Sequence, residues 1–154
     1  MTDDQNTLTP LEVAAAIAKS VVTKEMPDVF AVDALYVPKF AFPGAPQSIQ
    51  GRDAILQYFA AASKSPTSGI LKIEELTPTY YQGDDDEVVV MEFTLKGTNT
   101  NTNQPFEFNS SIGVLRVRDG LIVEWHDYPN MIGGATAAGT LPQLIAALEK
   151  IAAQ

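Results

Sequence analysis

The spacing of apolar residues divides this chain into a helical first part and a strand-rich second part. From about residue 70 onward the apolar residues recur with period two, which predicts strands at about 70–82, 87–97, 105–118 and 121–130. Asp119-Gly120 between the last two strands is a hairpin signal, because glycine accepts the positive φ that tight turns require. Alternation then places four residues on one face of the last strand: Leu121, Val123, Trp125 and Asp127.

Two helices are predicted before this region. The segment 9–12, Thr-Pro-Leu-Glu, has the form of a capping box and starts a helix that runs to about Met26. Gly51-Arg52-Asp53 opens a second helix, on whose buried face Phe59 lies. Between them we expect a short helix over 28–34 and a strand over 35–42.

The last part of the chain is predicted to be a flexible connection followed by a helix. Gly133-Gly134 and residues 135–139 form the connection, and 141–153 has the apolar spacing of an amphipathic helix. Residues 1–8 are expected to be a flexible lead-in. Helices followed by long antiparallel strands predict a single α+β domain over 1–154. A curved sheet with the N-terminal helices on its concave face and a C-terminal helix would leave a conical cavity.

Composition narrows the possible functions. The net charge of −9 argues against nucleic acid and anionic membrane surfaces as partners. The chain has no cysteine and one histidine, so a disulfide framework, a thiol nucleophile and a multi-histidine zinc site are excluded, and we expect no metal or cofactor. The acidic start of the chain is unlike a secretory signal, and no apolar run is long enough to span a bilayer. A cytoplasmic location is expected.

An aspartate in line with leucine, valine and tryptophan is the first candidate for chemistry. Asp127 is either a working acid or base in an apolar pocket, with a pKa raised by desolvation, or a structural carboxylate held by backbone donors. His126, the one imidazole, has the opposite parity and is expected on the outer sheet face.

Two segments carry a resemblance: Gly51-Arg-Asp-Ala-Ile55 and the hairpin from Gly113 to Tyr128. They resemble the SnoaL-like branch of the nuclear transport factor 2-like superfamily, which includes ketosteroid isomerase, limonene epoxide hydrolase and polyketide cyclases. The resemblance implies the cone fold and matches Asp127 to a catalytic aspartate of the epoxide hydrolase and the cyclases. Glu92 and Thr94 stand where the epoxide hydrolase has an arginine and a second aspartate, so its reaction is not expected here.

Other residues are expected around the same cavity. Trp125, Val123 and Phe59 would line it, and Asn109 and Ser111 would lie on the cavity face of the preceding strand and orient a ligand. Tyr36 is placed near the cavity mouth, where its phenol either stabilises an oxyanion or only packs.

Glu92 has two possible positions. If its strand face lines the cavity, Glu92 shares a proton with Asp127; if Met91, Phe93 and Leu95 face inward, Glu92 is a solvated surface residue.

Two functions follow from these expectations. The first is a cofactor-independent acid–base enzyme that isomerises, dehydrates or cyclises a small, largely apolar organic molecule, with Asp127, Glu92 and Tyr36 as its catalytic residues. The second is a non-catalytic ligand-binding or protein-interaction module on the same fold. In both cases the resemblance implies a homodimer that pairs the outer sheet faces.

Overall fold

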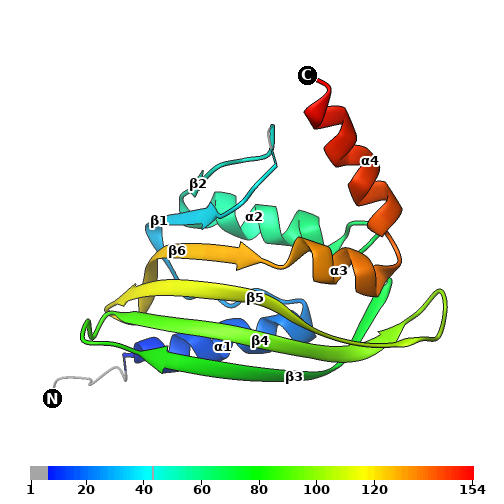
Figure 1. The fold of residues 1–154 in the computed structure, drawn as a ribbon. Coiled ribbons are helices and arrows are strands. Elements are labelled where there is room, and N and C mark those ends of the chain that lie inside the picture. The colour runs from blue at the N-terminus through cyan, green and yellow to red at the C-terminus, as the bar shows by residue number, and fades with distance from the viewer. Residues whose placement is uncertain (1–6, 43) are drawn as a thin grey trace, which may run out of the picture.

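A single curved sheet forms the centre of the molecule, and two helices cover one of its faces (Figure 1). The computed structural model describes residues 7–42 and 44–154, so the expectation for residues 1–6 lies outside the described residues. In the described part the strand order is β2-β1-β6-β5-β4-β3. Neighbouring strands are antiparallel except β1 and β6, which run parallel. The mixed α+β architecture predicted from the sequence is confirmed.

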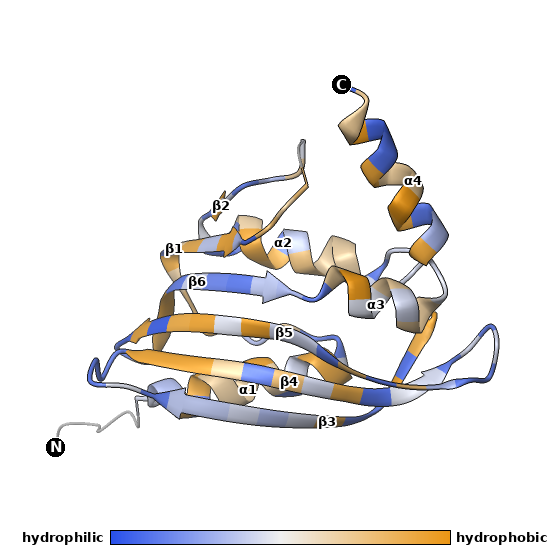
Figure 2. Ribbon diagram, in the orientation of Figure 1, coloured by the Kyte–Doolittle hydropathy of each residue, from blue (hydrophilic) through white to orange (hydrophobic). Residues whose placement is uncertain are grey.

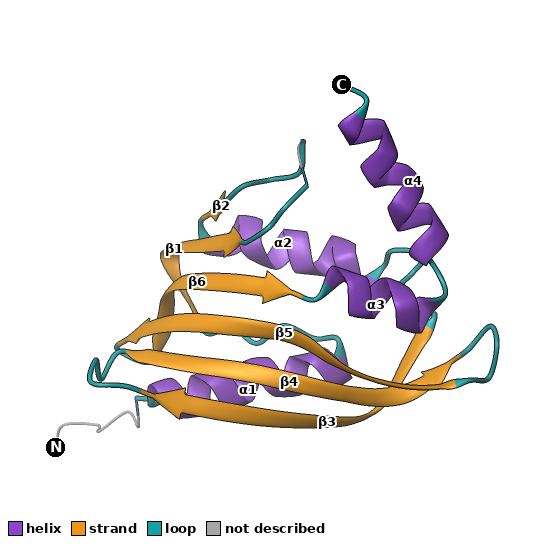
Figure 3. Cartoon of the chain, in the orientation of Figure 1, coloured by secondary structure: helices purple, strands orange, loops and turns teal. Residues whose placement is uncertain are grey.

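The four long strands of the second half lie where the period of two predicts them. Their bounds are Leu71–Gln82 for β3, Val88–Asn99 for β4, Pro105–Arg118 for β5 and Leu121–Pro129 for β6 (Figure 3). The turn between β5 and β6 has positive φ at Asp119 (52°) and Gly120 (76°). This backbone is the tight hairpin turn that Asp-Gly favours, because its twist matches the twist of the two strands.

The helix expected over 28–34 is wrong, because this segment belongs to strand β1, Phe30–Pro38. Phe30, Ala34 and Tyr36 are the buried residues of β1, so the first two are four positions apart, as on a helix. The spacing comes from an irregularity in the pairing with β6 between Phe30 and Leu35. The irregular pairing therefore gave the buried residues of this strand the spacing that is typical of a helix. The two-residue strand β2, Ile49–Gln50, completes this edge of the sheet.

Helices α1, Pro10–Thr23, and α2, Arg52–Ser63, lie on the inner face of the sheet. The predicted capping box is present: the Thr9 side chain accepts from the Glu12 amide, and the Glu12 carboxylate accepts from the Thr9 amide at 2.8 Å. The core between helices and sheet includes Ile17 and Ile55, together with buried side chains of β1, β4, β5 and β6.

The connection predicted after β6 is instead a helix, α3, Met131–Ala138. The Asn130 side chain caps it by accepting from the Gly133 amide, and the helix packs on β5. A Cβ at Gly133 would lie 2.9 Å from the Phe108 ring. The glycine that suggested flexibility therefore permits close packing.

The C-terminal helix α4, Leu141–Ala152, is present as predicted but stands away from the sheet (Figure 1). It contacts α3, and its apolar stripe is open, with Ile145 48% and Leu148 46% exposed. Figure 2 shows apolar and polar residues alternating along this helix. In the described part of the chain, no helix is long and apolar enough to cross a membrane.

Candidate active site

A cavity of about 600 Å³ lies between the two inner-face helices and the concave face of the sheet. Helix α1 contributes Ile17 and Val21, and helix α2 contributes Leu56 and Phe59. The sheet contributes four residues from three neighbouring strands: Phe93, Ser111, Trp125 and Asp127. The wall is largely apolar, and Asp127 is the lining carboxylate that the sheet supplies.

An aromatic cluster forms the wall of the cavity beside Asp127. The Trp125 ring is stacked on Phe59 at a centroid distance of 5.4 Å and an interplanar angle of 16°. The Tyr36 ring packs its edge against both rings, with centroid distances of 5.1 Å. Both Trp125 and Tyr36 are almost fully buried. The predicted cavity positions of Trp125 and Phe59 are therefore those that the structure shows.

Tyr36 and Asp127, both predicted as catalytic candidates, meet in the structure. The Tyr36 hydroxyl donates to Asp127 Oδ2 at 2.8 Å. Strands β1 and β6 run parallel here and bring together residues that are 91 positions apart in the chain. This hydrogen bond fixes the orientation of the carboxyl group.

The surroundings of Asp127 favour its neutral form. Burial raises the pKa of Asp127 to about 6, although the Tyr36 hydroxyl and the Tyr128 amide both act to lower it. Burial and the neighbouring Asp127 charge raise the pKa of Tyr36, so its phenol stays protonated. A carboxyl group with a pKa this close to neutrality can both take up and release a proton.

The hydrogen bond changes the role expected for Tyr36. A phenol has one hydrogen, and Tyr36 donates it to Asp127, so it cannot donate at the same time to an oxyanion on a ligand. Tyr36 is therefore better described as the residue that positions Asp127.

Two buried polar atoms beside the cavity have no hydrogen-bond partner among the described residues. They are Asp127 Oδ1 and Trp125 Nε1. Burying a polar group without a partner is costly, and such atoms in a native protein call for an explanation. Trp125 Nε1 lies over Gly113, where a Cβ would be 3.0 Å away, and Gly113 is opposite Asp127 in the β5–β6 register. The unpaired donor and the unpaired acceptor thus lie in one small region.

A bulge separates Ser111 and Asn109, which were both expected on the cavity face. Ser111 pairs with Phe93 and Asn109 pairs with Thr94, which leaves Ser110 as an extra residue in β5. Ser111 lines the cavity, whereas the Asn109 side chain accepts from Thr94 on the outer face at 2.8 Å. The expectation for Asn109 is wrong because a bulge reverses the side-chain parity. The run of three polar residues, 109–111, is the one sequence signal of this interruption.

A second bulge removes Val123 from its predicted place. Arg116 pairs with Glu124 and Val117 with Ile122, so Val123 is the extra residue of β6. Ile122 is fully buried in the core and Val123 is not part of the cavity lining. The parity assigned to Trp125 and Asp127 is correct, but the parity assigned to 121–123 is wrong.

Glu92 lies on the outer face of the sheet and not with Asp127. Its neighbours Met91 and Phe93 are buried, and the Glu92 carboxylate accepts from the Tyr81 hydroxyl at 3.0 Å. Of the two positions open to Glu92, the structure shows the solvated one, so the paired-acid arrangement is excluded. His126 is also on the outer face, where Nε2 lies 2.6 Å from Glu124 Oε1.

The mouth of the cavity contains polar residues that the sequence pattern did not indicate. Lys24 and Glu25 follow the end of α1, Ser63 is the last residue of α2, and Ser68 lies in the loop after it. Lys24 has a positive φ of 61°, and its Nζ donates to the Ser68 carbonyl at 2.9 Å. A helix end that turns back onto a loop distant in the chain leaves no periodic signal.

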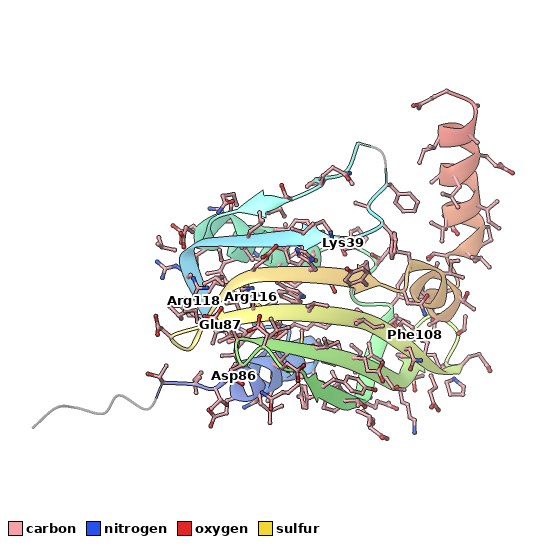
Figure 4. The ribbon with its side chains drawn as sticks, turned by 60° about the vertical axis from the view of Figure 1, so that its left-hand side comes forward. Lys39, Asp86, Glu87, Phe108, Arg116 and Arg118 are labelled. Atoms are coloured by element: carbon pink, nitrogen blue, oxygen red, sulfur yellow. The ribbon has the colours of Figure 1, made fainter. Side chains whose placement is uncertain are left out.

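The structure contains a second, polar surface that does not contact the cavity. Arg116 and Arg118 of β5 both form ion pairs with Glu87, the closest contact being 2.8 Å, and Figure 4 shows the three side chains at one end of the sheet.

Among the described residues there is no group of three or more histidine, aspartate or glutamate side chains that could hold a metal ion.

Comparisons with known proteins agree with this fold and place the chain in a family. The family model of the SnoaL-like domain matches residues 21–125, more than half of the chain. The chain belongs to the SnoaL-like family, and its fold is similar to the ketosteroid isomerase-like fold of solved structures.

Three relatives illustrate the similarity. The uncharacterised protein YesE of Bacillus subtilis is 34% identical over 96 residues, which are 59% of this chain and 61% of YesE. The structure of a proposed isomerase from Bacillus subtilis is 26% identical, with a TM-score of 0.66 over 86% of this chain and 97% of that one. A protein with a ketosteroid isomerase-like fold from Catenulispora acidiphila, 20% identical with a TM-score of 0.60, shares the fold over 86% of this chain and 95% of its own.

Proposed function

We propose that this protein is a cofactor-independent acid–base enzyme that isomerises, dehydrates or cyclises a small, largely apolar organic molecule. The observation that carries the proposal is the Asp127 carboxyl: it lies beside an aromatic cavity, its pKa is raised to about 6, and its Oδ1 has no hydrogen-bond partner among the described residues. A carboxyl group held by several backbone donors, with a lowered pKa, would have favoured a structural role. The comparison with a proposed isomerase supports the same class.

In this proposal each cavity residue has a separate task. Asp127 takes a proton from the substrate and returns it at a second atom, so that the reaction needs no other proton carrier. Tyr36 holds Oδ2 and leaves Oδ1 for the transfer. Phe59 and Trp125 bind the apolar body of the substrate and exclude water, which keeps the carboxyl group desolvated and its pKa high.

The experiment that tests this function follows proton transfer without assuming one substrate. The protein is incubated in D₂O with a panel of bicyclic ketones and β-hydroxy ketones, and mass spectrometry records deuterium gain and loss of water. The native protein should turn over at least one member, and Asp127→Asn should lower the rate about 10²- to 10⁴-fold. Fluorescence of the single tryptophan, Trp125, reports whether the variant still binds the compound.

The outcome also decides between the enzyme and the binding module. If ligands bind and neither exchange nor loss of water exceeds that of Asp127→Asn, the catalytic proposal is overturned and the cavity is a binding site. Glu92→Gln is the matched control, because this carboxylate lies on the other face of the same sheet and its removal should leave turnover unchanged.

We propose in addition that two copies pair through the outer sheet face. Ile112 is exposed there beside Tyr128, and Phe40, which is almost fully exposed, packs its ring on Tyr128 at 5.7 Å. Exposed apolar patches of this kind are often contact surfaces. Sedimentation should give a dimer mass for the native protein and a monomer mass for Ile112→Asp, and a native monomer would contradict the proposal.

A further inference from the structure

The cavity residues around Asp127 offer an unusual combination of hydrogen-bonding groups. Among the described residues, Asp127 Oδ1 is an acceptor without a partner and Trp125 Nε1 is a donor without one. The Ser111 hydroxyl lines the same cavity and makes no side-chain hydrogen bond within that part of the chain. The other lining serines donate to backbone carbonyls: Ser20 to Ile17, Ser63 to Ala60, and Ser68 to Ser63 and Ser65.

The sheet register brings these three groups together. Gly113 is opposite Asp127, and Ser111 is two residues from Gly113 on the same inner face, so Ser111 is a diagonal neighbour of Asp127. Diagonal neighbours in an antiparallel pair have Cα atoms about 7–8 Å apart. One ligand oxygen that forms two hydrogen bonds, each about 2.8 Å long, spans the distance between two such side chains. Glycine at 113 lets the Met91 side chain and the edge of the indole approach the strand, since a Cβ there would lie 2.7 Å from Met91 Cε and 3.0 Å from Trp125 Nε1.

The charged carboxylate decides which ligand group fits. Oδ1 of the carboxylate accepts and cannot donate, so the ligand must bring a hydrogen to it. Ser111 and Trp125 offer hydrogens, so the same ligand atom must also accept. A carbonyl oxygen can accept from Ser111 and Trp125 but has no hydrogen to donate to Oδ1. A hydroxyl group can do both.

We propose that the end of the cavity beside Asp127 is a hydroxyl-binding site that selects substrates carrying an alcohol on an apolar skeleton, with Ser111 and Trp125 as the donors to the alcohol oxygen. This inference rests on the proposed function and specifies its substrate class. The occupant is an organic alcohol and not a lone water molecule, because the apolar walls from Leu56, Phe59 and Met26 are in position to bind the attached skeleton.

Three compounds of one shape test the selection. 1-Tetralol donates and accepts, 1-tetralone accepts only, and tetralin does neither. Affinities are measured at pH 8, where Asp127 is charged, by titrating ¹⁵N-labelled protein and following the indole N–H signal, which is unique because the chain has one tryptophan. We expect 1-tetralol to bind about tenfold more tightly than the other two, and the indole proton to shift downfield with 1-tetralol.

Variants assign the selection to the named residues. Ser111→Ala should reduce the preference for 1-tetralol over 1-tetralone severalfold and leave the affinity for tetralin unchanged. Trp125→Phe, which lacks the indole N–H and is therefore titrated through backbone amide signals, should reduce the same preference, whereas the changed apolar contact alters the affinity for all three compounds alike. Ser110→Ala is the matched control, because this neighbouring serine is the bulge residue and is not part of the cavity lining. The control variant should keep the full preference and also shows whether a substitution in this strand disturbs the fold.

Each result has a definite meaning. Equal affinities for 1-tetralol and 1-tetralone, or an undiminished preference in both variants, would overturn the hydroxyl site, and so would a failure of all three compounds to bind. If the alcohol is preferred while Asp127→Asn retains full turnover in the D₂O assay, the hydroxyl site stands and the proton-transfer function falls. If turnover depends on Asp127 but the alcohol is not preferred, the function stands and the hydroxyl site falls.

Discussion

Asp127, near the end of β6, and Glu87, in the turn before β4, show how two regions of one sheet shift carboxyl pKa values in opposite directions. Burial beside the inner cavity raises the pKa of Asp127 to about 6. Hydrogen bonds from Arg118 and Arg116 lower the pKa of exposed Glu87 to about 2. Among the described residues the first carboxyl group has no cationic partner and the second has two, so the first is the one suited to exchange protons near neutral pH.

The largest expected difference in the free energy of unfolding is between substitutions at two adjacent residues of β6, one on the inner face of the sheet and one on the outer face. Trp125→Ala removes a buried ring that packs on Phe59 and Tyr36, and we expect it to lower the free energy of unfolding by about 3–5 kcal/mol. His126→Ala removes a partly exposed side chain paired with Glu124 and should cost less than about 1 kcal/mol. Urea denaturation of the two variants measures both values. Similar losses would show that the outer face is as closely packed as the inner one.

The second prediction concerns the pH dependence of stability. Because the pKa of Asp127 is about 6 in the folded protein and about 4 in an unfolded chain, the folded state binds more protons between these values, and this residue lowers stability as pH rises from 4 to 6. Asp127→Asn should therefore stabilise the protein by about 1–3 kcal/mol at pH 8 and have little effect at pH 4. Thermal unfolding of both proteins across this range measures the difference.

Glu87→Gln should change the pH dependence of stability in the direction opposite to Asp127→Asn. The pKa of Glu87 is lowered by folding, so its contribution is present above the unfolded value near 4.5 and is lost as pH falls toward 2. The variant should be slightly less stable than the native protein at pH 7, and the difference should shrink at high salt and at low pH. A variant that is equally destabilised at pH 2 would show that the arginine pairs are not the cause.

The third prediction tests the close packing beneath the cavity. A Cβ at Gly113 would lie 2.7 Å from Met91 Cε and 3.0 Å from Trp125 Nε1, so Gly113→Ala should destabilise the protein by about 1–3 kcal/mol and shift the indole N–H signal. Gly83→Ala is the control, because a Cβ there meets nothing within 4 Å, and its stability should be unchanged or slightly raised. An unshifted indole signal in Gly113→Ala would contradict the geometry.

The smallest effect on stability is expected for substitution of Glu92, which lies on the face of the sheet opposite Asp127. Glu92→Gln keeps an acceptor for the Tyr81 hydroxyl on the outer face, so stability should stay within about 0.5 kcal/mol of the native value. Tyr81→Phe should behave in the same way. A loss of stability well above this value in either variant would contradict the prediction.

The elements of the second half could be predicted because a half-buried strand repeats its apolar residues every second position. The hairpin turn, the capping box and the parity of Trp125 and Asp127 follow from such local rules. The wrong predictions for residues 28–34, Asn109 and Val123 have one physical cause. Irregular pairing near Phe30 and bulges at Ser110 and Val123 change the side-chain parity, and a bulge depends on the partner strand as well as on the strand that contains it.

The sequence by itself determined the α+β class, the family resemblance and the choice of Asp127 as the first candidate for the proposed chemistry, because these follow from periodicity and from short segments. Only the tertiary structure decided that Tyr36 holds Asp127, that Ser111 enters the cavity while Asn109 leaves it, and that Glu92 lies on the other face. These facts depend on register between strands distant in the chain, and register is set by the packing of the whole sheet.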